Sequence, residues 1–121
     1  MLGHKIMGAG VPSLLTIALT QDVGAALSAA GTTQGTATEL TATDNEVTTV
    51  GANAGVVLAS KLAPGDEQTV YNAGANPLKV YPPSGLKIRP LAANAAMTLG
   101  VNTGCIYKCV STTTIYGILS A

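Results

Sequence analysis

The fold is decided by the stretch at residues 66–85, which reads DEQTVYNAGANPLKVYPPSG. It holds two segments in which apolar and polar residues alternate, with a Gly-Ala-Asn turn between them and a second turn at the end. Pairing Ala73 with Pro77 across the first turn brings Val70 opposite Val80, and the residues next to these two point the other way. The stretch therefore predicts a β-hairpin with one apolar face.

Segments of strand length continue from about Gly31 to the end of the chain, separated by turn signals such as Pro64-Gly65-Asp66. Short strands with a turn roughly every ten residues indicate an all-β fold, an antiparallel β-sandwich or jelly-roll-like domain of about eight strands, and they argue against a βαβ fold. The expected segments are residues 36–41, 47–50, 56–60, 67–72, 78–81, 86–89, 95–99, 105–110 and 114–119.

The last two segments predict a second hairpin. A two-residue loop would shift its register and turn one strand over. We expect a three-residue loop at 111–113, since it leaves Lys108 and Thr114 on the outer side. The side chains that then share one face are Cys105, Tyr107, Cys109, Ile115 and Leu119.

Residues 1–30 differ in character and are expected to form an N-terminal arm ahead of a β-sandwich domain at 31–121. Ser13 could cap a short helix, but Gly24 and several β-branched residues weaken it, so an extended arm is an equal alternative. The apolar side chains of the arm must pack either on the protein's own core or on a partner. They include Leu14, Leu15, Ile17 and Leu19.

The amino-acid composition limits the number of domains, the residues that can build the core and the expected partners. The 121 residues suit one domain, and the lack of Trp and Phe means that Val, Leu, Ile and Ala must build its core. Charged residues make up 10% of the chain and balance to zero, which favours association with other protein surfaces. Without a basic excess or a long apolar run, we expect neither nucleic acid nor a membrane as partner.

Residue chemistry predicts no enzyme. His4 is the only histidine, and its Gly-rich surroundings offer no cysteine or carboxylate pair to complete a nucleophilic site. Cys105 and Cys109 would lie about 13 Å apart in a strand, too far for a disulfide, so we expect free buried thiols and a reducing, cytoplasmic origin. They lack further zinc ligands, and Asp44 and Glu46 lack a calcium loop around them. We expect no metal and no cofactor.

Two surface features suggest contacts. Tyr71 and Tyr81, with Lys79 between them, would share the outer face of the first hairpin, where they would meet a sugar or a protein partner or be covered by the arm. Most acidic residues precede residue 68, and four of the basic ones follow it. This segregation would suit head-to-tail contacts between copies, although a solvated surface explains it as well.

The runs AGTTQGTATELTA at 30–42 and NEVTTV at 45–50 open a series of motifs. In order and spacing, the series resembles a group of small virion-associated proteins of tailed bacteriophages, over about residues 29–119. The motifs that follow are Val-Val-Leu at 56–58, Pro-Gly-Asp at 64–66, Tyr-Asn-Ala-Gly-Ala-Asn at 71–76, Val-Tyr-Pro-Pro at 80–83 and Leu-Ala-Ala-Asn-Ala-Ala at 91–96.

The resemblance implies a capsid decoration or cement protein, a β-sandwich bound to the outer capsid surface of the virion after synthesis in the host cytoplasm. Its implied partners are the major capsid protein and copies of itself, as a homotrimer at threefold positions. The alternative is a tail, collar or head-fibre module that contacts host glycans or a receptor-binding protein. The expected contact residues are Leu14, Leu15, Ile17, Leu19, Tyr71, Lys79 and Tyr81.

Overall fold

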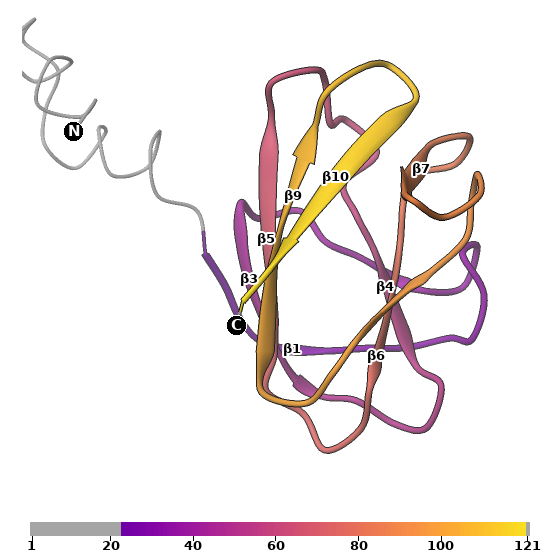
Figure 1. Ribbon diagram of the computed structural model, residues 1–121. Coiled ribbons are helices and arrows are strands. Elements are labelled where there is room, and N and C mark those ends of the chain that lie inside the picture. The colour runs from indigo at the N-terminus through magenta and orange to yellow at the C-terminus, as the bar shows by residue number, and fades with distance from the viewer. Residues whose placement is uncertain (1–22, 121) are drawn as a thin grey trace, which may run out of the picture.

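The computed structural model describes residues 23–120, and the prediction of an all-β fold is confirmed for them (Figure 1). They form a six-stranded sheet in the order β1-β3-β5-β9-β10-β7 and a four-stranded sheet in the order β2-β4-β6-β8. The predicted contact residues of the arm lie outside this range, as does His4. The strands are β1 (Val23–Ser28), β2 (Thr38–Glu39), β3 (Asp44–Thr49), β4 (Gly55–Val57), β5 (Glu67–Asn72), β6 (Leu78–Tyr81), β7 (Lys87–Arg89), β8 (Met97–Leu99), β9 (Thr103–Cys109) and β10 (Thr114–Leu119).

The chain alternates between the two sheets from β1 to β8, so its path resembles the winding of a solenoid. Up to β6, strands that follow each other in one sheet run parallel: β1 with β3, β3 with β5, β2 with β4, and β4 with β6. Strands β10 and β7 are also parallel, and the antiparallel pairs are β5–β9, β9–β10 and β6–β8. The expectation of an antiparallel jelly-roll order is wrong.

The first predicted hairpin does not form, because β5 and β6 belong to different sheets. Val70 lies beside Cys105 and Val80 beside Val56, although both valines are fully buried in the same core. Alternation with a period of two shows which side chains face the core. It does not show whether the next strand pairs in the same sheet or lies in the opposite sheet, across the core. Here β6 lies in the opposite sheet.

Hydrogen bonds and close packing hold the turn between β5 and β6 as the chain passes from one sheet to the other. The side-chain amide of Asn72 donates hydrogen bonds to the carbonyl oxygens of Asn76 and Leu99, at 2.9 and 3.0 Å, and its oxygen accepts one from the backbone N–H of Gly74 at 2.9 Å. A Cβ atom at Gly74 would lie 2.6 Å from Cγ2 of Val50, so only glycine fits there. The Gly-Ala-Asn turn is thus packed into one end of the core.

The second predicted hairpin is confirmed in its register. Ile115 pairs with Cys109 and Leu119 with Cys105, across a three-residue loop at 111–113. Ile115 and both cysteines are buried, as is Tyr107, whereas Leu119 is 55% exposed at the open end of the hairpin. The inner face was therefore predicted correctly except at its last residue.

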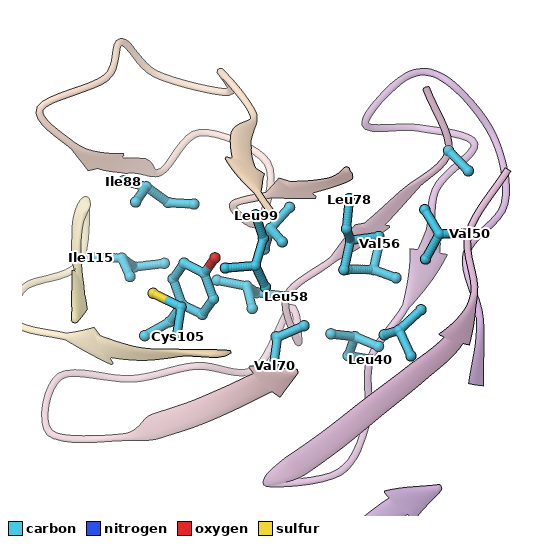
Figure 2. Close-up of a cluster of buried hydrophobic side chains, with 14 of the residues drawn as sticks. Leu40, Val50, Val56, Leu58, Val70, Leu78, Ile88, Leu99, Cys105 and Ile115 are labelled. Atoms are coloured by element: carbon cyan, nitrogen blue, oxygen red, sulfur yellow. The ribbon is translucent and has the colours of Figure 1, made fainter. Parts of the chain in front are cut away.

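The two sheets enclose one core, made chiefly of aliphatic side chains as predicted (Figure 2). Tyr107 is its one fully buried aromatic ring among the described residues, and its hydroxyl lies 3.5 Å from the sulfur of Met97. The members of the core are Leu40, Val47, Val50, Ala54, Val56, Leu58, Val70, Leu78, Val80, Ile88, Leu99, Cys105, Tyr107, Cys109 and Ile115.

Part of the predicted arm belongs to the sheet. Residues 23–28 are extended and pair in parallel with β3 as its edge strand, and Leu27 packs against the core. The pairing is irregular after Gly24, where Ala26 has a φ of 55°. Such bulges are common on edge strands, where they discourage pairing with foreign strands.

Candidate functional site: the outer face of the six-stranded sheet

The outer face of the six-stranded sheet carries an apolar patch, which we define as Tyr71, Ile106 and Ile118. The strand register places Ile106 of β9 opposite Ile118 of β10, while Tyr71 of β5 lies opposite Gly104 in the next row. All three side chains are exposed, and Ile118 is 58% exposed. With neighbouring residues they line a shallow groove of about 260 Å³.

Gly104 shapes this groove. A Cβ atom at Gly104 would lie 3.2 Å from Cδ1 of Tyr71, which is a tight contact. The glycine therefore lets the tyrosine ring lie close to the sheet, and a larger residue there would push the ring outward. An apolar concavity of this kind on a sheet face is typical of a protein-binding surface.

Opposite charges lie on the two sides of the patch. We call Asp44 and Glu46 of β3 the acidic side, and Lys87 and Arg89 of β7 the basic side. On each side an exposed tyrosine is the register neighbour of a charged residue: Glu46 pairs with Tyr71, and Arg89 pairs with Tyr116. The guanidinium of Arg89 lies 5.7 Å from the centre of the Tyr116 ring, within the range of a cation–π contact.

The charges in the middle of the face neutralise each other. Lys108 of β9 lies opposite Glu67 of β5, with Nζ 3.5 Å from Oε2. Both side chains are about half exposed, so the pair stabilises the fold by at most about 1 kcal/mol. Its main effect is to leave no net charge between the acidic side and the basic side.

The structure does not bring together the predicted contact residues Tyr71, Lys79 and Tyr81. Tyr71 is on the six-stranded sheet, whereas the other two lie on β6 in the four-stranded sheet. The hydroxyl of Tyr81 donates a hydrogen bond to the carbonyl of Thr32 at 2.9 Å, and the ammonium of Lys79 donates one to the hydroxyl of Thr98 at 3.3 Å. The three were grouped because the first hairpin was wrongly expected.

Sequence reasoning missed the residues that replace them. Ile106, Tyr116 and Ile118 lie on the outer side of the second hairpin and are all exposed. The signal was available, because these are the residues between the correctly assigned inward positions. An outer side with three large apolar or aromatic residues is unusual for a solvated hairpin.

The two cysteines are free and buried, as predicted. Burial raises the pKa of the Cys105 thiol and that of the Cys109 thiol above the usual value, and burial also raises the pKa of Tyr107. Thiols react with electrophiles and bind metals as thiolates, so a raised pKa keeps both groups unreactive near neutral pH. Their part in the fold is to fill the core.

A second, polar groove of about 310 Å³ lies where β5 begins and is lined in part by Lys61, Asp66 and Gln68. The side chains of Asp66 and Gln68 already make hydrogen bonds that stabilise the fold. The carboxylate of Asp66 accepts a hydrogen bond from the backbone N–H of Ala63 at 3.0 Å, which closes the turn before β5. The amide of Gln68 donates to the carbonyls of Leu40 and Ala42 and accepts from a further backbone N–H.

Comparisons with protein-family models, with curated proteins and with solved structures found no match. Between residues 23 and 120, no three His, Cys, Asp or Glu side chains gather in a way that could hold a metal ion. In the same part of the chain, no helix has the length and apolar character needed to cross a membrane.

Proposed function

We propose that this protein is a structural component of a tailed-bacteriophage virion, a decoration or cement protein that binds the outer surface of the head shell. One observation carries the proposal: the series of motifs over about residues 29–119, in the order and spacing of small virion-associated proteins. In this proposal the protein has no catalytic role. Its partners are the major capsid protein and further copies of itself.

Two of the motifs behind the resemblance form turns that depend on hydrogen bonds from particular side chains. This supports the view that the resemblance reflects more than a similar composition. The Asn-Ala-Gly-Ala-Asn motif makes the crossing from β5 to β6. In the Leu-Ala-Ala-Asn-Ala-Ala motif, the side-chain oxygen of Asn94 accepts hydrogen bonds from the backbone N–H of Gly85 at 2.7 Å and from the amide of Gln34 at 3.1 Å. Sequences with these motifs at this spacing would be able to make the same turns.

The outer face supports a role in protein contacts. A cement protein needs many weak contacts with the shell, because multivalent attachment gives strong overall binding without turnover. The apolar patch offers exposed Tyr71, Ile106 and Ile118, and aromatic residues are enriched in the cores of protein interfaces. We propose that this patch contacts the shell. The number of copies in one assembly, three, comes from the resemblance alone.

The copy number per virion tests the proposal. Quantitative mass spectrometry of purified virions should find hundreds of copies per particle, as expected for a protein that covers the shell. A reconstruction of the particle should place the domain on the outside of the head. If the protein is missing from the particle, the proposal is wrong.

A handful of copies would favour the alternative class, a tail, collar or head-fibre module. The exposed tyrosines Tyr71 and Tyr116 would then be candidates for stacking on host sugars, because sugars bind well to flat aromatic rings. Binding of the purified protein to an array of host glycans would distinguish this module from one that supports a receptor-binding protein.

A further inference from the structure

The acidic side and the basic side of the six-stranded sheet are separated within one molecule. From β3 to β7 the order is β3-β5-β9-β10-β7, so four strand spacings of about 4.8 Å put the two sides roughly 19 Å apart. At physiological salt, attraction between exposed charges fades beyond about 8 Å. Among residues 23–120 the one salt bridge joins Glu67 and Lys108, so the four charges on the two sides have no ionic partner there.

The two sides also face different directions. Neighbouring strands rotate by about 20–25° relative to each other, and four such steps amount to roughly 90°. In Figure 1, β3 and β7 lie on opposite sides of the molecule. Two copies placed face to face over the apolar patch would therefore leave their charged sides pointing away from each other.

We propose that the acidic side of one copy binds the basic side of the next copy in a head-to-tail contact. Asp44 and Glu46 with Tyr71 then meet Lys87 and Arg89 with Tyr116. The arrangement combines opposite charges with arginine and tyrosine, the residue types that contribute most at protein interfaces. A contact between two different surfaces repeats from copy to copy, and it forms a ring if the rotation closes.

This contact uses Tyr71 of the apolar patch and leaves Ile106 and Ile118 free for another partner. It deepens the self-association in the proposed function, but it can be tested on the purified full-length protein without virions. A protein that assembles head-to-tail yet is missing from the particle would leave this inference standing and refute the virion role. A protein that is present on the particle but does not assemble head-to-tail in solution would refute this inference and leave the virion role standing.

Charge reversal gives the test. One variant, Asp44→Lys with Glu46→Lys, makes both sides basic, and another, Lys87→Glu with Arg89→Glu, makes both acidic. In sedimentation equilibrium at up to about 100 µM, wild-type protein should assemble, and each variant alone should associate about tenfold more weakly or worse. Added salt should weaken the wild-type assembly.

Two further samples, one variant and one mixture, make the test specific. A chain that carries all four reversals should assemble like the wild type, because every contact again joins opposite charges. An equal mixture of the two variants should also associate, but only in alternation, so it can close even-numbered rings and never a trimer. Lys61→Glu with Lys79→Glu is the matched control, since it makes the same charge change away from both sides and should leave assembly unchanged.

Circular dichroism melting curves for every variant would exclude unfolding as the cause of lost assembly. Wild-type protein that stays monomeric at about 100 µM would overturn the proposal. Variants with reversed charges that associate as strongly as the wild type would overturn it as well. If the full chain is monomeric and a chain without residues 1–22 assembles, those residues cover one of the sides in place of a second copy. That result would overturn it too.

Discussion

Neighbouring residues of β6 show how sharply the environment changes at the residue scale. Val80 is fully buried and lies between Val56 and Met97 of the adjacent strands. Lys79, one position earlier, points away from the core and reaches the hydroxyl of Thr98. Because successive side chains of a strand face opposite ways, the same substitution should destabilise the protein far more at Val80 than at Lys79.

Val80→Asp should lower the free energy of unfolding by about 4 kcal/mol or more, because it buries a carboxylate with no partner in an aliphatic core. Lys79→Asp places the same side chain on the outer side of the same strand, and its effect should stay below about 1 kcal/mol. Urea denaturation of both variants gives the comparison. Equal losses for the two would contradict the assignment of Val80 to the core.

At the scale of elements, the connection between β5 and β6 determines the topology. The backbone polar groups of this turn lie next to the core, where an unsatisfied carbonyl costs free energy. The side-chain amide of Asn72 donates to the carbonyl of Asn76 in this turn, and also to the carbonyls of Leu99 and Gly100 at the end of β8, the last at 3.2 Å. One buried side chain thus joins the end of β5 to the start of β6 and to the end of β8.

Asn72→Ala should destabilise the protein by about 3 kcal/mol, since it removes the hydrogen bonds that this buried amide donates to the carbonyls of Asn76 and Leu99 and leaves a small void. Asn102→Ala is the matched control, because Asn102 is exposed in the nearby turn before β9 and loses only the asparagine's tolerance of a φ of 61°. That control should cost about 1 kcal/mol. Thermal unfolding of the two variants would reveal the difference, and a control as damaging as Asn72→Ala would refute the role given to the buried amide.

At the scale of the whole molecule, β1 closes one edge of the six-stranded sheet. Its backbone pairs with β3, and the N–H of Ala29 just beyond it donates to the carbonyl of Thr49 at 2.8 Å. Leu27 packs on the core from this strand. Since β1 is part of the sheet, we expect the domain to begin with β1 and not at residue 31.

Two truncations test this boundary. A chain that begins at residue 23 should melt at the same temperature as the full chain, because it keeps the ten strands found within residues 23–120. A chain that begins at residue 29 loses β1 and the Leu27 contact, and its melting temperature should fall by about 10 °C or more. If the two truncated chains melt together, β1 is dispensable.

Much of the fold could be predicted from the sequence, because strand periodicity and turn residues act over short distances. Alternation identified Val70, Leu78 and Val80 as core residues, and all three are fully buried. The three-residue loop at 111–113 followed from a choice between two registers, of which one exposed the polar side chains. The strand expected at 47–50 begins earlier in the structure, at Asp44, and Asp44 and Glu46 are both exposed on β3.

The candidate site could be predicted only in part. The segregation of acidic and basic residues along the chain was visible, but their positions on the sheet were not. Lys79 and Tyr81 were expected beside Tyr71 and lie on the other sheet. Neighbours on a sheet face come from different strands, so an error in strand pairing moves a whole group of residues to another surface.

The sequence by itself determined most of the strand segments after residue 31 and most of their buried side chains, because both depend on local alternation and on turn chemistry. Tertiary structure alone decided which strands lie side by side. A segment such as β5 can bury its apolar face equally well with β6 alongside it or across the core, and the choice depends on distant residues. Here the packing of Gly74 against Val50 and the bonds from Asn72 to Leu99 send the chain across. That crossing puts Tyr71, Ile106 and Ile118 on one outer face, with opposite charges on its two sides.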